Sequence, residues 1–226
     1  MIADSASSEP RWRRLPEERP RQIIEAALDV FSERGLSAAR LEDIAKQAGV
    51  SKGTIYLYFP NKEALFCEMV REMVGESITS AQIRITGGKD TATEQYANYI
   101  RAVWHKVRSP VFDKLHRIVE ADLQSYPALM QFFFSEISLR SMDVAAGIIL
   151  HGIETGEFRQ VDPAAVTRIH HAVLIKHSVW CGKREQIPFV AHLSDEEVFD
   201  QLLDFMLHSI IRVPVSPPAA PARGAQ

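Results

Sequence analysis

Residues 52–58, KGTIYLY, hold one cation, one threonine hydroxyl and two phenols in a short segment. If the segment is helical, at about 100° per residue, Leu57 lies almost opposite Ile55 and points away from the core that Ile55 faces. Leu57 could then lie against a thymine methyl, and its neighbours suit contacts to phosphates and base edges in a DNA major groove. These neighbours are Lys52, Gly53, Thr54, Tyr56 and Tyr58. For each tyrosine, and more so for Tyr58, the alternative is core packing with the hydroxyl at the surface.

Other chemistries find less support in the sequence. Three of the eight histidines, His170, His171 and His177, fall in one predicted helix, and His170 and His177 share a face two turns apart. The two cysteines, Cys67 and Cys181, lie far apart without metal-ligand spacing, so we predict no metal and no cofactor. A buried or interfacial histidine that titrates with pH is the alternative. We find no nucleophile–base pair, phosphate loop or HExxH motif, and therefore predict that the protein is not an enzyme.

The elements that position residues 52–58 form a compact pattern. A short helix over 41–48 is followed at once by Gly49, which suits the positive φ of a tight turn. Val50 fills the turn, and Ser51 is placed to cap the next helix through the backbone N–H near Thr54. This spacing predicts a helix-turn-helix, and the alternative is a tight corner in an all-α core.

Helical periodicity covers nearly the whole chain, and strand signals are almost absent. A capping proline or polar residue opens several segments, such as Asp162-Pro163 and the SDEE capping box at 194–197. Pro and Ala dominate the last residues, which cannot bury apolar surface. We predict about nine helices; they include 20–35, 41–48, 52–58, one from 61 onward that fades near Gly87–Gly88, 91–108, 110–124, 127–155, 163–180 and 194–212.

Bulk composition is typical of a globular protein and does not by itself indicate a partner. The chain has 226 residues, 46% hydrophobic and 24% charged, with a net charge of −3. We expect a cytoplasmic protein with no membrane span and no secretory signal. Local charge is more informative, because RWRR at 11–14 is either a minor-groove arm or, as we favour, a solvated tail that aids encounter with DNA.

Residues 20–66 resemble the DNA-binding domain of the TetR family of bacterial regulators. The stretch AGVSKGTIYLYFPNKEALF carries the resemblance through Gly49, Ser51, Gly53, Thr54, Ile55, Tyr56, Tyr58, Phe59, Lys62 and Leu65. It implies that Lys52, Gly53, Thr54, Tyr56, Leu57 and Tyr58 meet DNA and that Lys62 contacts phosphate. The family usually opens its second helix with Thr and Ser or Thr, where this chain has Ala39 and Arg40. We expect a lost side-chain cap there, and Arg40 is a candidate phosphate contact.

The resemblance also implies the fold class and domain order. We expect an all-α protein with a three-helix, homeodomain-like helix-turn-helix domain, followed by a larger helical domain for ligand binding and dimerisation. The predicted divisions are a disordered basic tail at 1–19, the DNA-binding domain at 20–66, the effector-binding and dimerisation domain at 67–212, and a disordered tail at 213–226.

Apolar residues of the last two helices form a broader band than one surface helix buries. A central position in a bundle would explain this band, but we favour a homodimer interface made by the two helices and their symmetry mates. The candidate interface residues are Val166, Val173, Trp180, Leu202, Phe205 and Met206. A twofold dimer would place two recognition helices on successive major grooves of a palindromic operator.

An apolar effector pocket is expected among the middle helices. Each aromatic taken alone is more often a core residue, and His116 with Glu120 is more often a surface pair. Three consecutive phenylalanines, 132–134, cannot all face inward. The candidate pocket residues are Trp104, Phe112, His116, Glu120, Phe133, His170 and His177.

The sequence therefore predicts a DNA-binding transcriptional regulator, a repressor released from its operator by a small, largely apolar molecule. One alternative is a helical interaction or ligand-binding module that keeps the helix-turn-helix as a scaffold, with Leu57 in a protein contact. An all-α enzyme that uses the middle-helix cavity is the other.

Overall fold

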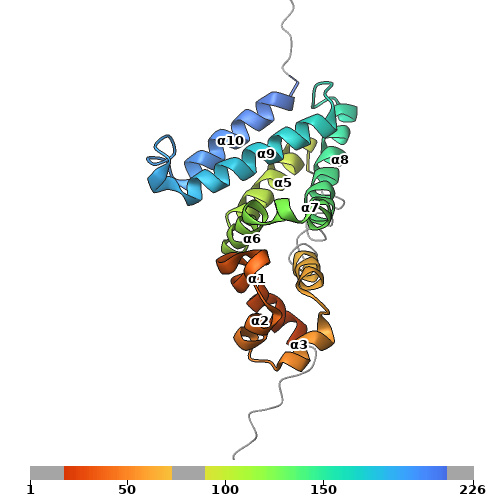
Figure 1. The fold of residues 1–226 in the computed structure, drawn as a ribbon. Coiled ribbons are helices and arrows are strands. Elements are labelled where there is room, and N and C mark those ends of the chain that lie inside the picture. Colours follow the sequence, from red (N-terminus) through yellow and green to blue (C-terminus); the bar gives the residue numbers. More distant parts are fainter. Residues whose placement is uncertain (1–17, 73–89, 213–226) are drawn as a thin grey trace, which may run out of the picture. The chain divides into compact units, whose positions relative to one another are not determined.

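The computed structural model describes residues 18–72 and 90–212, and within these ranges the regular structure is helical throughout. The chain forms two compact units (Figure 1). The first unit combines the described residues up to 72 with Lys114–Phe133, and the second combines residues 90–113 and 134–212. The predicted all-α class is confirmed.

Helix α1 (Arg19–Ala38) supplies much of the core of the first unit. Its inward face carries Ile23, Ala27 and Phe31, each no more than 1% exposed. Gly35 interrupts the helix with φ 78° and ψ 156°, a conformation that a residue with a Cβ rarely adopts. The break leaves the backbone N–H of Leu36 free of the helix ladder, and Asp122 Oδ2 accepts it at 2.7 Å.

The predicted helix-turn-helix is present. Helix α2 (Leu41–Ala48) ends at Gly49, which is left-handed with φ 67° and ψ 32°. Helix α3 (Lys52–Tyr58) starts at Ser51, whose side chain accepts the Thr54 backbone N–H at 3.1 Å. Ile55 is fully buried and holds α3 against the core. As expected from Arg40 at its N-cap, α2 begins without a side-chain cap.

Four further helical segments contribute to the first unit. Residues 62–72 are helical, opened by Asn61, whose Oδ1 accepts the Ala64 N–H at 2.7 Å. Helix α6 (Pro110–Ala121) passes from one unit to the other, and η2 (Leu123–Ser125) and α7 (Pro127–Phe133) follow it. Lys114 of α6 forms an ion pair with Asp29 of α1.

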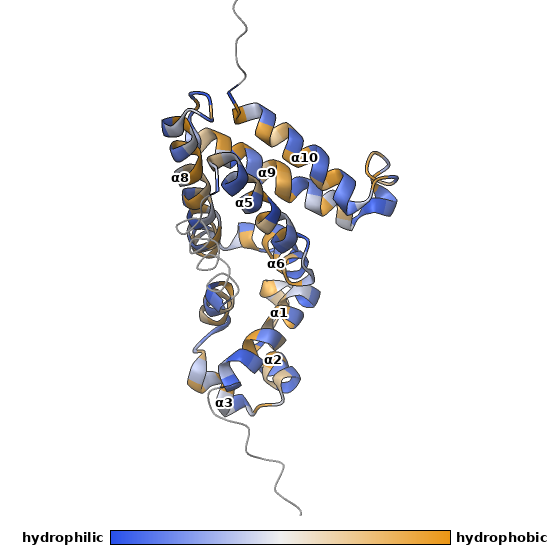
Figure 2. Ribbon diagram, turned by 180° about the vertical axis from the view of Figure 1, so that it is seen from behind, coloured by the Kyte–Doolittle hydropathy of each residue, from blue (hydrophilic) through white to orange (hydrophobic). Residues whose placement is uncertain are grey.

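The second unit is a bundle in which α9 (Pro163–Gly182) packs against α5 (Ala92–Val107), α8 (Arg140–Thr155) and α10 (Asp195–Ile210). Polar and apolar residues alternate along α10, as an element with one buried side requires (Figure 2). The predicted helix at 127–155 is interrupted, because Phe134–Leu139 forms a π-helical segment between α7 and α8. Phe133 is buried and Phe134 is 49% exposed, so the phenylalanines diverge as expected.

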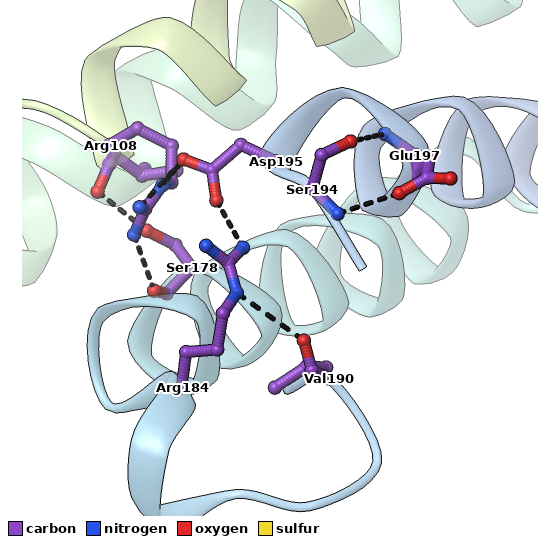
Figure 3. Close-up of polar contacts among 8 residues, drawn as sticks. Arg108, Ser178, Arg184, Val190, Ser194, Asp195 and Glu197 are labelled. Carbon is purple, nitrogen blue, oxygen red and sulfur yellow. Dashed lines mark hydrogen bonds and ion pairs between the residues drawn. The ribbon is translucent and has the colours of Figure 1, made fainter. Parts of the chain in front are cut away.

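Polar contacts fix the start of α10. Ser194 and Glu197 form the predicted capping box, and Asp162 caps α9 as predicted. Asp195 Oδ2 accepts two bonds from Arg108, at 3.0 and 2.7 Å, while its Oδ1 accepts one from Arg184 at 2.6 Å (Figure 3). This network joins the end of α5, the turn η4 (Arg184–Gln186) and α10.

Several predictions concern residues outside the described ranges. These are residues 1–17 of the predicted tail at 1–19, which include RWRR, the tail at 213–226, and the loop at Gly87–Gly88. Arg19, also assigned to the first tail, is instead the first residue of α1. The two-unit division also differs from the predicted boundary at residue 66. Residues 114–133 were assigned to the effector domain but pack with the first unit, because α6 and the segment after it hold α1 through Lys114 and Asp122.

Candidate nucleic-acid interface and ligand cavity

The outward face of α3 carries side chains that the fold does not use for packing. Leu57 is 80% exposed and Tyr56 is 44% exposed, whereas Tyr58 is partly buried. A Cβ built on Gly53 would meet only Ser51 Oγ, at 3.9 Å, so nothing inside the protein requires glycine there. A residue without a side chain and an exposed leucine side by side indicate a surface shaped for a close partner.

Glu42 of α2, which the sequence reasoning missed, organises this face. Its Oε1 lies 2.7 Å from Lys52 Nζ and accepts a bond from Tyr56 Oη at 3.3 Å. The bond from Lys52 lowers the pKa of Glu42, and the same contact raises the pKa of Lys52. An acidic residue in the first turn of the helix before α3 was the available signal, since α2 and α3 pack together.

The basic residues predicted to flank α3 have different environments. Arg40 is exposed at the N-cap of α2. Lys62 donates from Nζ to the carbonyl oxygens of Ser37, at 2.9 Å, and Ala39, at 3.4 Å. Its ammonium therefore holds the connection between α1 and α2, a role that its motif position did not reveal. Thr54 Oγ1 lies 2.8 Å from Ser51 Oγ at the helix cap.

The second unit contains a cavity of about 240 Å³, slightly smaller than the roughly 300–1,000 Å³ of common ligand sites. Its walls are mostly apolar and come from α5, the start of α6, the π-helical segment, α8 and α9. The lining residues are Tyr99, Ala102, Val103, Lys106, Val107, Phe112, Ile137, Ser138, Ser141, Val144, His171 and Ile175.

A polar cluster occupies part of the cavity wall. Tyr99 Oη lies 2.8 Å from the Ser141 carbonyl, the Ser141 hydroxyl and His171 Nε2. His171 Nδ1 lies 2.9 Å from the Thr167 carbonyl, so Nδ1 carries the proton and Nε2 accepts. Burial lowers the pKa of His171 and raises that of Tyr99, which keeps both groups neutral near pH 7.

Among the described residues that line the cavity, Lys106 is the one lysine. Its side chain is half-buried and has no hydrogen-bond or ion-pair partner among residues 18–72 and 90–212. Burial lowers its pKa, because the surrounding apolar groups do not compensate the ammonium charge.

Of the predicted pocket residues, only Phe112 lines this cavity. Trp104 is a core residue with its ring 5.9 Å from Phe199, and Phe133 is buried in the first unit. His116 and Glu120 form an i,i+4 pair at 3.1 Å in the first unit, which is the alternative that the sequence reasoning gave.

The two predicted pocket histidines have structural partners instead. His170 is buried between Tyr96 Oη, at 2.6 Å, and Ser209 Oγ, at 3.0 Å. His177 Nδ1 lies 2.9 Å from the Val173 carbonyl. Within the described ranges, no group of three or more His, Cys, Asp or Glu side chains could hold a metal ion. Likewise, no described helix is both long enough and apolar enough to cross a bilayer.

The candidate interface residues divide by exposure. Leu202 and Met206 are 6% and 0% exposed within a single chain, so their side chains fill its core. Phe205 is 59% exposed on the same helix, and Val166, Val173 and Trp180 are partly exposed on α9. Ile169 and Leu150 are also at least half exposed, on α9 and α8, and the predicted set omitted both.

Comparison with known proteins identifies the chain. Residues 23–69 match the family described as bacterial regulatory proteins, tetR family. The fatty acid metabolism regulator protein of Bacillus subtilis is 32% identical over 148 residues, which are 65% of this chain and 75% of that protein. The chain belongs to the TetR family. It is a DNA-binding transcriptional regulator.

Other TetR-family relatives extend the similarity across both units. The HTH-type transcriptional regulator RutR of Escherichia coli K12 is 26% identical over 202 residues, covering 85% of this chain and 89% of RutR. The crystal structure of FadR from Bacillus subtilis in complex with stearoyl-CoA matches with a TM-score of 0.68 and 28% identity, over 83% of this chain and 97% of that one. The matched TetR segment contains α2, α3 and Lys62.

Proposed function

We propose that this protein is a homodimeric repressor whose two α3 helices bind a palindromic operator and which releases DNA when a largely apolar molecule fills the cavity of the second unit. The observation that carries the DNA-binding role is the outward face of α3. It combines the exposed Leu57 with a Gly53 that the fold itself does not require.

Each residue on this face has a role that its chemistry supports. Lys52 exchanges Glu42 for a backbone phosphate, and Tyr56, which shares Glu42, is released with it to reach a phosphate or a base edge. Leu57 lies against a thymine methyl, while Gly53 lets the helix backbone come close. Thr54, Tyr58 and the exposed Arg40 contact phosphates, and Lys62 supports the interface through its carbonyl contacts.

The dimer forms through the exposed apolar side chains of α8, α9 and α10. Leu150, Ile169 and Phe205 are each at least half exposed, and burying them against a second copy is favourable. In a twofold pair, the α3 helices would meet major grooves about 34–36 Å apart, or a multiple of this spacing.

We propose that helix α6 couples the cavity to the DNA-binding unit, because residues of this one helix belong to both units. Phe112, in its first turn, lines the cavity, and two residues later Lys114 pairs with Asp29 of α1. At its C-terminal end, Asp122 accepts the Leu36 N–H at the break in α1. A ligand that displaces Phe112 would therefore act on α1 through one continuous helix. Stearoyl-CoA bound to the similar FadR supports an apolar effector.

Fluorescence anisotropy with operator DNA selected from the source genome tests this function. Lys52→Ala should weaken binding and make the plot of log affinity against log salt shallower by about 0.9 for each lost phosphate contact. Lys183→Ala removes an exposed lysine from the second unit and is the matched control. Equal affinity and an equal salt slope for wild type and Lys52→Ala would contradict the proposed role of α3.

A further inference from the structure

The cavity of the second unit has different polar chemistry at two places along α5. Tyr99 and Lys106 both line it and are seven residues apart, which is about 10 Å along a helix axis. Val103 lines the wall between them. A ligand that used both polar groups would need an apolar middle that bridges this distance.

At the Tyr99 end of the cavity, hydrogen-bond acceptors outnumber hydrogen-bond donors. Four atoms can accept there: the Ser141 carbonyl, the two hydroxyl oxygens and His171 Nε2. His171 donates its proton elsewhere, to the Thr167 carbonyl, which leaves only the two hydroxyl hydrogens. A neutral ligand group that donates a hydrogen bond therefore fits this end, whereas a carboxylate would face lone pairs.

The opposite requirement holds at Lys106. Its ammonium is half-buried on an apolar wall and has no partner in the part of the chain that the structure describes. An acidic group would satisfy the charge, and a charge-assisted hydrogen bond to a partly desolvated ammonium is among the stronger polar contacts.

We infer that the cavity takes an elongated amphiphilic acid: a carboxylate at Lys106, an apolar middle, and a hydroxyl or other neutral donor at the Tyr99–Ser141–His171 cluster. The inference rests on the proposed effector role of this cavity and specifies the class of effector. An extended chain advances about 1.2 Å per bond, so a span of about 10 Å corresponds to roughly eight or nine bonds.

Three probes of equal length separate the two ends in calorimetric titrations of the full chain: 10-hydroxydecanoate, decanoate and decan-1-ol. Apolar burial alone favours decan-1-ol, because desolvating a carboxylate without a partner is costly. We expect the reverse order, with 10-hydroxydecanoate binding severalfold more tightly than decanoate, and decanoate at least about tenfold more tightly than decan-1-ol.

Variants assign each preference to its residue. Lys106→Met keeps most of the apolar stem and should abolish the preference for decanoate over decan-1-ol, whereas Lys106→Arg should retain it. Tyr99→Phe removes one of the two donor hydrogens and leaves the Ser141 carbonyl and His171 Nε2 as acceptors, so it should increase the preference for the hydroxylated probe and leave the preference for the carboxylate intact. Ser141→Ala makes the same test in the same cluster if Tyr99→Phe does not fold.

Three results would overturn the inference: tighter binding of decan-1-ol than of decanoate, unchanged probe ratios in Lys106→Met, or no saturable binding of either acid. A parallel anisotropy assay with operator DNA separates this inference from the proposed function. Probes that bind in the expected order without releasing DNA would leave the ligand class standing and remove the proposed effector role.

Discussion

Replacing Gly53 with alanine separates the role of this residue in protein stability from its role in DNA binding. Gly53 lies inside α3, has no positive φ, and has room for a Cβ beside Ser51 Oγ. Alanine is favoured over glycine by about 0.8–1.0 kcal/mol in a helix interior. Gly53 is near the start of a seven-residue helix, so we expect about half of that value, roughly 0.5 kcal/mol of added stability.

The same methyl group should weaken DNA binding. If the backbone of α3 lies close to the duplex, the added methyl overpacks that contact at a cost of at least about 1 kcal/mol. A dimer carries two copies, so the expected loss is about 2 kcal/mol, or roughly 30-fold in affinity. Stability and DNA affinity should therefore move in opposite directions.

Urea unfolding and operator anisotropy measure the two effects on one preparation. Gly147→Ala is the matched control, because Gly147 is exposed on α8 and a Cβ there would touch nothing within 4 Å. It should stabilise the protein without changing its affinity for DNA. If Gly53→Ala binds operator as tightly as wild type, α3 does not approach DNA through Gly53, and our interpretation of the outward face of α3 is wrong.

Three other predictions concern the second unit. A Cβ at Gly152 would overlap the Phe158 ring, so Gly152→Ala should cost about 1–3 kcal/mol of unfolding free energy, measured by urea denaturation. Burial, and to a lesser extent His171, lower the pKa of His170 to about 4. The pKa of histidine in the unfolded chain is about 6.5, so the contribution of neutral His170 to the free energy of unfolding should be fully present above pH 6.5. It should fall by about 3 kcal/mol as the pH drops to 4. His170→Gln should flatten this pH dependence, whereas His208→Gln, at an exposed site, should not. Burial works to raise the pKa of Asp195, but hydrogen bonds from two arginines outweigh it and lower the pKa. Because the site is partly exposed, Asp195→Asn should cost only about 1–2 kcal/mol at pH 7, seen as a lower Tm, and an unchanged Tm would refute a stabilising role for the network.

Local signals explain why the helix-turn-helix could be predicted. Gly49 takes the left-handed conformation, and Ser51 caps α3, because both depend on a few neighbouring residues. The orientation of Ile55 and Leu57 follows from helical periodicity alone. The same reasoning placed the helix caps at Asp162 and Ser194 correctly.

The cavity could not be predicted in this way. Tyr99, Ser141 and His171 come from three helices, and only tertiary packing brings them together. The sequence reasoning selected aromatic residues, but large aromatics such as Trp104 are buried in the core because that removes the most apolar surface from water. The π-helical segment at Phe134–Leu139 shifts the helical register between α7 and α8. No single residue in the sequence predicts this segment.

The first unit is assembled from two separate stretches of chain, which matters for anyone who exchanges parts between regulators. A fragment that stops near residue 72 would lack Asp122 and Lys114, and would leave the Leu36 amide and the Asp29 carboxylate without these partners. Hybrid proteins that join this DNA-binding unit to the ligand-binding domain of another regulator should therefore include residues 114–133. The boundary between the two units lies inside helix α6, and a domain boundary chosen from sequence similarity alone would not be placed there.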